Sequence, residues 1–200
     1  MDELGFIPVT LIPIIWIIAA YLLGSISFGI LISKLYRLPD PRTVGSCNPG
    51  ATNVLRSGKK SAAILTLLGD GFKGWFIVWL SLQSGMLMWV VAAVGLSVFF
   101  GHLYPIYHKF KGGKGVATAL GVMLAISIWL GLAALITWAL VFAVTRYSSL
   151  AAVLAAALYK SDFIDAFEAK FGAKPQMGER YSATSFIRSL NSYGWVRDKK

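Results

Sequence analysis

Residues 11–33 read LIPIIWIIAAYLLGSISFGILIS, a run of 23 apolar or small residues that ends at Lys34. About 20 such residues are enough to span the hydrocarbon of a bilayer as a helix. Ser25, Gly29 and Ser33 recur every four residues, so this helix has one small face against which a neighbouring membrane helix can pack closely. The stretch therefore predicts a membrane-spanning helix within a helical bundle.

The composition points the same way. Of the 200 residues, 56% are hydrophobic and 14% are charged, whereas soluble domains average about 45–50% and about 25%. A net charge of +10 would suggest nucleic acid in a soluble protein. In a membrane protein, basic loops collect on the cytoplasmic side, beside anionic lipid. The expected partner is therefore the lipid bilayer and not nucleic acid, and the bases leave room for an anionic ligand.

Two features of the chain exclude other classes. Cys47 is the single cysteine, which excludes a disulfide within the chain and a multi-cysteine metal site. We expect neither a metal nor a cofactor. The N-terminus opens with Asp2 and Glu3 instead of bases, so it does not read as a standard signal peptide.

The remaining apolar runs alternate with basic loops. The runs cover residues 61–82, 86–107, 116–145 and 149–159, and the loops cover residues 34–60 and 109–115. The 30 residues of the third run would make about 45 Å of helix. We favour a break near Ser127–Gly131, which gives two short tilted crossings, over one overlong helix. The sequence thus predicts an all-α, multi-pass bundle with about five to six short crossings.

The charges also predict the orientation and a tail. Acids precede the first run and bases follow it, which places the N-terminus outside and both basic loops in the cytoplasm. Residues 160–200 hold five of the nine acids and eight of the nineteen bases, as a polar tail would. Two interpretations of this tail stay open. One is an amphipathic helix that lies on the bilayer surface through Phe163, Ile164, Phe167 and Phe171, and the other is a loosely ordered segment.

The first basic loop has the composition of a phosphate site. Residues 44–56 read VGSCNPGATNVLR, in which glycine and small residues let backbone N–H groups turn toward an anion, and a helix that starts near Thr52 adds its positive end. Arginine suits phosphate through its planar fork. The candidate phosphate ligands of this loop are Arg42, Gly45, Asn48, Gly50, Thr52, Asn53 and Arg56. The alternative is an ordinary turn with its arginines on lipid headgroups.

The second basic loop repeats this chemistry. Residues 101–118 read GHLYPIYHKFKGGKGVAT, and Lys111 and Lys114 lie on a glycine-rich turn before a helix start. Residues 113, 117, 121 and 125 are glycine or alanine and form a small packing face. His102 is the one plausible imidazole base besides His108, which reads as an interfacial residue. A lone histidine at a helix end is more often structural than catalytic.

Asp70 and Lys73 interrupt the second apolar run three residues apart. Charges at that depth are costly, and they are paired or functional. A mutual ion pair or an interfacial position ranks ahead of catalysis. Residues 69–74 match G-x-G-x-x-G, but no strand precedes them, so the match carries no nucleotide site. The sequence has no Walker loop, no histidine followed by aspartate five residues on, and no Gly-x-Ser-x-Gly elbow.

Four segments resemble the bacterial acyl-phosphate:glycerol-3-phosphate acyltransferase family in order and spacing. They are YLLGSISFG at 21–29, GS at 45–46 through NVLR at 53–56, Asp70 with KG at 73–74, and GHLYP at 101–105 through KGGKGVAT at 111–118. The likeness covers about residues 15–159. It implies transfer of a fatty acyl group from acyl-phosphate to the sn-1 hydroxyl of glycerol 3-phosphate, giving lysophosphatidic acid and phosphate at the cytoplasmic face of the bacterial inner membrane.

The resemblance also implies roles for individual residues. Ser46, Asn53, Arg56 and Lys114 would contact phosphate, and Ser149 matches a further polar position near the site. The catalytic candidates are Ser46, His102 and Ser149. Phosphate is already a good leaving group, and in this family a substrate phosphate has been suggested as the base, so no catalytic dyad is needed.

The sequence departs from the family at two places. Cys47 stands where the family usually has glycine, the residue with most freedom at positive φ, so a distorted loop is the expectation if positive φ is needed there. Residues 160–200 lack the further apolar crossing and the His-Arg-x-Asn-Ile ending of the family. We therefore divide the chain into a transmembrane catalytic domain, residues 1–159, and the tail, and we expect little acyltransferase activity from this chain. The alternatives are an inactive relative that binds anionic lipid headgroups and, on thinner grounds, a small anion transporter.

Overall fold

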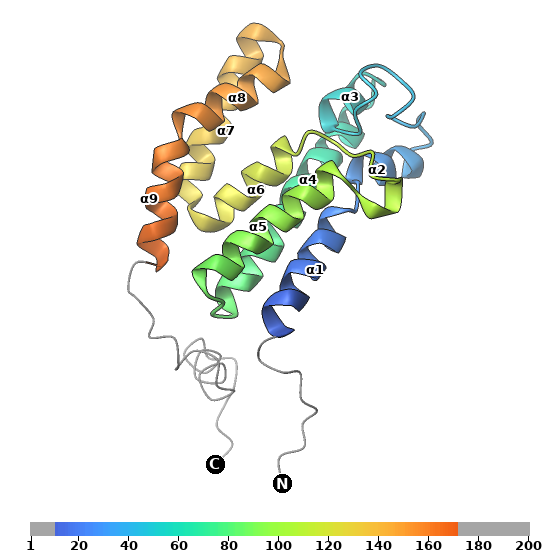
Figure 1. Cartoon of the computed structure of the whole chain (residues 1–200). Coiled ribbons are helices and arrows are strands. Elements are labelled where there is room, and N and C mark those ends of the chain that lie inside the picture. Colours follow the sequence, from blue (N-terminus) through green and yellow to red (C-terminus); the bar gives the residue numbers. More distant parts are fainter. Residues whose placement is uncertain (1–10, 172–200) are drawn as a thin grey trace, which may run out of the picture.

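The computed structural model describes residues 11–171, and every regular element among them is a helix (Figure 1). In chain order the elements are α1 (Ile12–Gly24), α2 (Phe28–Leu35), α3 (Ala51–Leu55), α4 (Lys60–Gln83), α5 (Met88–Leu103), the 3-10 turn η2 (Ile106–His108), α6 (Val116–Ile126), α7 (Ile128–Thr145), α8 (Ser148–Leu158) and α9 (Lys160–Phe171). The predicted all-α class is confirmed.

Three segments are long and apolar enough to cross a membrane: Lys60–Gln83, Met88–His108 and Ile128–Thr145. The pair α1 and α2 makes a fourth if it counts as one span, although it bends by 41°. α6 and α8 are apolar but have only 11 residues each. The figure of five to six crossings stays a prediction.

The first apolar run is not one continuous helix, as the sequence suggested, but two helices that meet at Ser25–Ser27. In an unbroken helix, the Phe28 N–H would donate to the Gly24 carbonyl. Here the Phe28 N–H donates to Asp70 Oδ1 at 3.4 Å, and Lys73 Nζ donates to the Gly24 oxygen at 2.9 Å. The two charged side chains of α4 therefore replace the backbone hydrogen bond that the bend removes, because a freed backbone group inside a membrane needs another partner.

Small residues bring the inner helices into backbone contact. A Cβ on Gly74 would overlap the Thr118 carbonyl, and one on Gly121 would overlap the Gly71 carbonyl. The Thr118 hydroxyl donates to the Asp70 carbonyl at 2.9 Å. α4 therefore packs on α6 at close range, as the predicted small face requires. A second face of α4 and helix α1 enclose α5, whose valines Val90, Val94 and Val98 are fully buried.

The long apolar run breaks at Ser127, within the predicted window. Ser127 has an extended backbone, and its hydroxyl accepts from the Leu130 N–H at 3.4 Å, so it caps α7. α7 then returns along α6, and α8 runs back against α7. Figure 1 shows the turn between α7 and α8, which holds Arg146, at the same end of the molecule as both basic loops.

The first part of the tail is a helix that packs on the bundle, and its contact with a bilayer surface stays a prediction. Phe163 and Phe167 of α9 pack against the core formed by α5 and α6. Lys170 Nζ donates to the carbonyl oxygen of Ile126 at 2.9 Å and so caps the broken end of α6. Ile164 is 46% exposed. Residues 172–200, with most of the tail, lie outside the described residues.

Candidate active site

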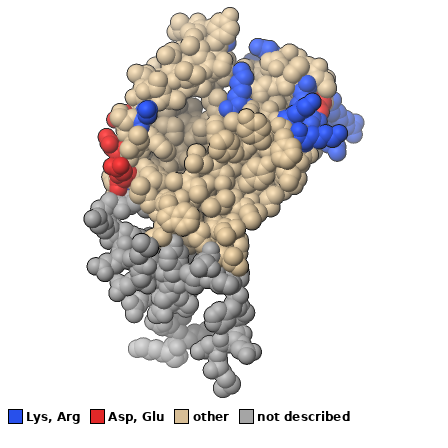
Figure 2. Space-filling model, viewed as in Figure 1, with Lys and Arg blue, Asp and Glu red and all other residues tan. Residues whose placement is uncertain are grey.

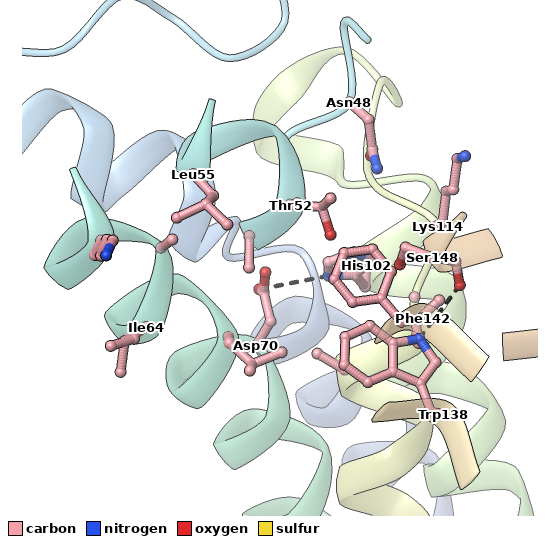
Figure 3. Close-up of a pocket in the computed structure, with 18 residues that line it drawn as sticks. Asn48, Thr52, Leu55, Ile64, Asp70, His102, Lys114, Trp138, Phe142 and Ser148 are labelled. Carbon is pink, nitrogen blue, oxygen red and sulfur yellow. Dashed lines mark hydrogen bonds and ion pairs between the residues drawn. The ribbon is translucent and has the colours of Figure 1, made fainter. Parts of the chain in front are cut away.

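A cavity of about 380 Å³ opens at the end of the bundle that carries the basic loops (Figure 3). It lies between α3, the first half of α4, the loop before α6 and the α7–α8 hairpin. Its polar lining residues are Asn48, Thr52, Lys60, Asp70, His102, Lys114 and Ser148. Its apolar wall includes Leu67, Trp138 and Phe142. The cavity thus joins a polar, cationic region to an apolar one.

Asn53 organises the first loop from within. It is 3% exposed, and its Oδ1 accepts the Ser46 N–H at 3.0 Å while its Nδ2 donates to the carbonyls of Pro41 at 2.7 Å and Val44 at 3.0 Å. All of these are backbone groups of the loop. Gly45, at φ +58°, lies so close that a Cβ would overlap Asn53 Oδ1. Asn53 and Gly45 therefore shape the loop, and the amide of Asn53 already has its partners.

The two arginines beside this loop lie outside the cavity lining. Arg42 forms a two-pronged ion pair with Asp40, with Nη2 to Oδ2 at 2.6 Å and Nε to Oδ1 at 3.0 Å. The hydrogen bonds from Arg42 lower the pKa of Asp40, and the carboxylate raises the pKa of Arg42. Arg56 ends α3 and is exposed. Figure 2 shows most of the visible lysines and arginines gathered on the side of these loops, opposite the side where most of the visible acids lie.

Cys47 adopts the backbone conformation that a glycine would favour. Its φ is +56°, in the left-handed region, which costs an L-residue about 1–2 kcal/mol. The loop thus passes through positive φ at the position where the family usually has glycine. The side chain is exposed, so the substitution strains the backbone without filling the cavity.

The second loop passes directly over His102. The Gly113 N–H donates to the His102 carbonyl at 3.1 Å, and a Cβ on Gly113 would overlap His102 Nε2. Glycine at 113 therefore lets the loop reach the imidazole and bring Lys114 to the cavity. Lys111 is exposed and lies outside the lining.

Beneath the loop, three ionisable side chains meet in the protein interior. Lys73 Nζ lies 2.9 Å from Asp70 Oδ1 and 2.9 Å from His102 Nδ1, and Asp70 Oδ1 lies 3.5 Å from the same imidazole nitrogen. The ion pair predicted from the spacing of Asp70 and Lys73 is confirmed. The sequence did not connect it with His102, which comes from α5 and arrives only through packing.

The α7–α8 hairpin forms the third wall. Trp138 stacks on Phe142 with ring centroids 5.2 Å apart and donates its indole N–H to the Ser148 carbonyl at 3.2 Å. Ser148 lines the cavity, whereas Ser149 is exposed and does not. The sequence did not predict Trp138 and Phe142 as lining residues. An aromatic pair four residues apart in an apolar run has the same sequence pattern whether it faces lipid or a cavity.

Five of the predicted site residues meet in this cavity, and seven lie around it. The lining includes Asn48, Gly50, Thr52, His102 and Lys114. Outside it lie Arg42, Gly45, Ser46, Asn53, Arg56, Lys111 and Ser149. Lys60 lines the cavity but was not predicted as a ligand, although it is the last residue of the first basic loop.

The fold and the site together define an integral membrane protein with an anion-accepting cavity at one end of its helical bundle. Comparison with known proteins makes this class specific. The sequence profile of the family described as glycerol-3-phosphate acyltransferase matches residues 14–171.

Individual relatives belong to the same family as the matching profile. The chain is 67% identical over 144 residues to a glycerol-3-phosphate acyltransferase of Methylobacillus flagellatus. The aligned region covers 72% of this chain and 74% of that protein. It is 58% identical over 160 residues to the one of Nitrosospira multiformis, covering 77% and 79%.

Solved structures extend the agreement to the fold. The structure is similar to the crystal structure of PlsY, an integral membrane glycerol 3-phosphate acyltransferase, in its glycerol 3-phosphate form. The TM-score is 0.70 at 34% identity, over 94% of this chain and 96% of that one. The lysophosphatidic acid form gives a TM-score of 0.67 at 35% identity, over 92% and 94%.

The chain therefore belongs to the glycerol-3-phosphate acyltransferase family. It is an enzyme of phospholipid synthesis, a membrane-embedded acyltransferase. The matched region also runs 12 residues further than the likeness seen in the sequence, from Tyr159 to residue 171, and so includes α9.

Proposed function

We propose that the cavity binds glycerol 3-phosphate beside an acyl-phosphate and transfers the acyl group to the sn-1 hydroxyl. The observation that carries this proposal is the cavity itself, where Lys114 and Thr52 face the same space as the apolar wall of Trp138 and Phe142. An acyl-phosphate needs both environments, because its phosphate is anionic and its chain is apolar. The two PlsY structures, in glycerol 3-phosphate and lysophosphatidic acid forms, support this choice.

The reaction needs positioning more than a strong protein nucleophile. The sn-1 oxygen attacks the acyl carbonyl carbon, the bond from that carbon to the phosphate oxygen breaks, and the hydroxyl proton leaves to a phosphate oxygen of a substrate. The products are lysophosphatidic acid and phosphate. Holding two anions together is the main obstacle, and fixed cations and N–H groups remove it. No metal or cofactor takes part in this scheme.

We assign the residues accordingly. Thr52, Asn48 and Lys114 hold phosphate directly, with Lys60 and Ser148 at the edge of the cavity. Gly50 precedes α3, and its lack of a Cβ leaves room for the side-chain amide of Asn48. Asn53 and Gly45 hold the loop, and with it the Ser46 backbone, in shape. Arg42, Arg56 and Lys111 form a basic rim that attracts anionic substrates.

The basic end of the bundle lies in the cytoplasm of the bacterial inner membrane in this proposal, with the N-terminus outside. The support is the charge asymmetry across α1 and the gathering of both basic loops at one end (Figure 2). Cys47, the single and exposed cysteine, is a natural reporter. A membrane-impermeant maleimide should label Cys47 only after the cells are permeabilised, and labelling in intact cells would overturn this orientation.

The proposed division into a catalytic domain, residues 1–159, and a tail, residues 160–200, rests on the lining. Every residue that lines the cavity lies between Asn48 and Ser148. α9 is then a support, which caps α6 through Lys170. The histidine and asparagine that the family ending would supply have no counterpart in residues 160–171. We therefore expect slow turnover.

The test compares the full chain with a chimera whose residues 160–200 are replaced by the ending of the Methylobacillus flagellatus relative. Phosphate release from palmitoyl-phosphate is followed with and without glycerol 3-phosphate. We expect release that depends on glycerol 3-phosphate, at least tenfold faster in the chimera, since misplacing one catalytic wall alone costs about 10²-fold. Lys114→Met should abolish release in both proteins, and the exposed Lys59→Met serves as control. If neither protein responds to glycerol 3-phosphate, the chain is a lipid-headgroup binder instead.

A further inference from the structure

The ammonium group of Lys73 has more acceptors than protons. Its Nζ lies 2.9 Å from the Gly24 carbonyl oxygen, 2.6 Å from that of Ile26, 2.9 Å from Asp70 Oδ1 and 2.9 Å from His102 Nδ1. Lysine is 1% exposed at this position, so water does not supply alternatives. Four neighbours therefore compete for at most three N–H groups.

The carboxylate fixes the charge of the lysine. A neutral amine would have two N–H groups, which the two carbonyls would use, and its lone pair would then face Asp70 at 2.9 Å. An ammonium group has a third proton for Asp70 and His102 to share. Lys73 is therefore charged, because the buried carboxylate needs a cation within hydrogen-bonding distance.

The charged lysine in turn fixes the imidazole. An ammonium group donates and cannot accept, so a nitrogen 2.9 Å away must offer a lone pair. Nδ1 of His102 is thus unprotonated, and the ring carries its single proton on Nε2. The 3.5 Å between Nδ1 and Asp70 Oδ1 agrees, since it is too long for a strong hydrogen bond from a protonated Nδ1.

The opposite edge of the ring faces the cavity. His102 lines it while being only 6% exposed, and Nε2 has no hydrogen-bond partner among residues 11–171. Gly113 lies against Nε2, and Lys114 follows it into the lining. Nε2 is open to the cavity and is not among the fully buried unpartnered atoms of the described residues, so an anionic oxygen in the cavity would supply its hydrogen-bond partner.

We propose that Lys73 holds His102 as the neutral Nε2–H tautomer, so that His102 donates a hydrogen bond to an oxygen of the phosphate-bearing substrate instead of acting as a base. This inference rests on the proposed function for the identity of the ligand. The charged groups that contact the imidazole are Asp70 and Lys73 from α4, and Lys114 from the second loop lines the same cavity. Lys73 is a positioning residue, and His102 touches the substrate.

The tautomer can be measured without any catalysis. The sequence has two histidines, so His108→Gln leaves His102 as the only imidazole. We would label this full-length protein with ¹⁵N-histidine and record the two ring nitrogens by NMR in micelles at neutral pH. We expect one protonated nitrogen, assigned to Nε2. A protonated Nδ1, or two protonated nitrogens, overturns the proposal.

A second variant tests the role of Lys73. Asp70→Ala combined with Lys73→Met removes both charges, which avoids leaving one of them unpaired. We expect the single tautomer to become a mixture in which Nδ1–H is measurable. A spectrum that keeps only Nε2–H shows that Lys73 does not position the ring. If the double variant does not fold, the spectrum of the His108→Gln protein still decides the tautomer.

Binding tests the hydrogen bond itself. Glycerol 3-phosphate, but not glycerol, should move the Nε2–H proton signal. His102→Gln keeps a donor near the position of Nε2 and should bind glycerol 3-phosphate within a few-fold of the parent, whereas His102→Phe should bind about tenfold or more weakly. Equal binding by both variants overturns the donor role. If the parent does not bind glycerol 3-phosphate at all, the proposed function fails, and the NMR spectrum still decides the tautomer.

Discussion

The inner helices α1, α4, α5 and α6 and the outer helices α7 and α8 are built from largely apolar sequence but pack very differently. Val94 and Val98 of α5 are fully buried, whereas Val144 of α7 is 85% exposed. Figure 1 shows the outer helices beside α6, on the side away from α1. Apolar side chains alone do not distinguish the two groups, because lipid accepts them as readily as protein does.

The difference comes from small residues. Gly24 contacts Val98, Gly74 contacts Thr118, and Gly121 contacts Gly71, each at backbone distance. Only Gly131 in the outer group makes such an approach, against Leu124. Close backbone contact therefore builds the inner bundle, and the outer hairpin is free to contribute side chains to the cavity between the two groups.

Gly121→Leu should have the largest effect, because it disrupts the close backbone packing of the inner helices. Its side chain would overlap the Gly71 carbonyl, and backbone cannot move aside cheaply, so we expect a loss of more than about 4 kcal/mol and little folded protein. Thermal unfolding in detergent measures it. Ala139→Leu, on the exposed side of α7, makes a similar increase in size and should leave the unfolding temperature within a few degrees. Equal effects of the two changes would contradict the division into inner and outer groups.

Lys73→Met should destabilise the inner bundle by about 3–5 kcal/mol, because it leaves Asp70 charged and unpaired in the interior. It also frees the Gly24 carbonyl at the α1–α2 bend. The matched change Lys160→Met, on the exposed side of α9, should change the free energy of unfolding by less than about 0.5 kcal/mol. Urea unfolding followed by tryptophan fluorescence compares them. A mild effect of Lys73→Met would show that the bend does not depend on the ion pair.

Trp138→Ala should separate activity from stability in the outer hairpin. It removes the apolar wall of the cavity, so we expect kcat/KM for the acyl donor to fall at least about tenfold, equivalent to about 1.4 kcal/mol. The unfolding temperature should fall by only a few degrees. Trp129→Ala, at a site 79% exposed, is the control and should leave kcat/KM unchanged. If both changes act alike, Trp138 does not contact the acyl donor.

Cys47→Gly should stabilise the protein by about 1 kcal/mol, because glycine adopts φ +56° without steric cost. For a chain of this length, that corresponds to a rise of about 2–4 °C in the unfolding temperature. Cys47→Ala removes the thiol but keeps a Cβ, and it should give no rise. A rise with alanine as large as with glycine would place the effect in the thiol and not in the backbone.

Asp40→Asn should have the smallest effect. The pKa of Asp40 is lowered in the folded protein by Arg42, so the pair stabilises the fold above the unfolded value of about 3.9 and loses this contribution as pH falls through the lower folded value. The pair is partly exposed and screened, so we expect less than about 1 kcal/mol at pH 7. The variant and the parent should converge as the pH falls below the lowered folded pKa of Asp40. A difference that grows toward low pH would reverse the assigned sign.

The sequence by itself predicted the membrane bundle, a break within Ser127–Gly131, the two basic loops and, as one of two alternatives, the Asp70–Lys73 pair. These depend on local composition and on spacing along one helix, which a single chain displays directly. The resemblance to the family pointed to glycine at position 47, and the structure gives Cys47 a positive φ there.

The tertiary structure alone decided which polar groups share a space. His102 meets Lys73 only because α5 packs beside α4, and Ser148 replaces Ser149 on the cavity wall because the start of α8 turns that residue inward. Asn53 reads as a ligand in the sequence, but the fold surrounds its amide with backbone partners. Such outcomes depend on contacts between residues 7 to 29 positions apart that only the fold brings together, and the hydrophobic pattern of one helix carries no information about which side chain its neighbour presents.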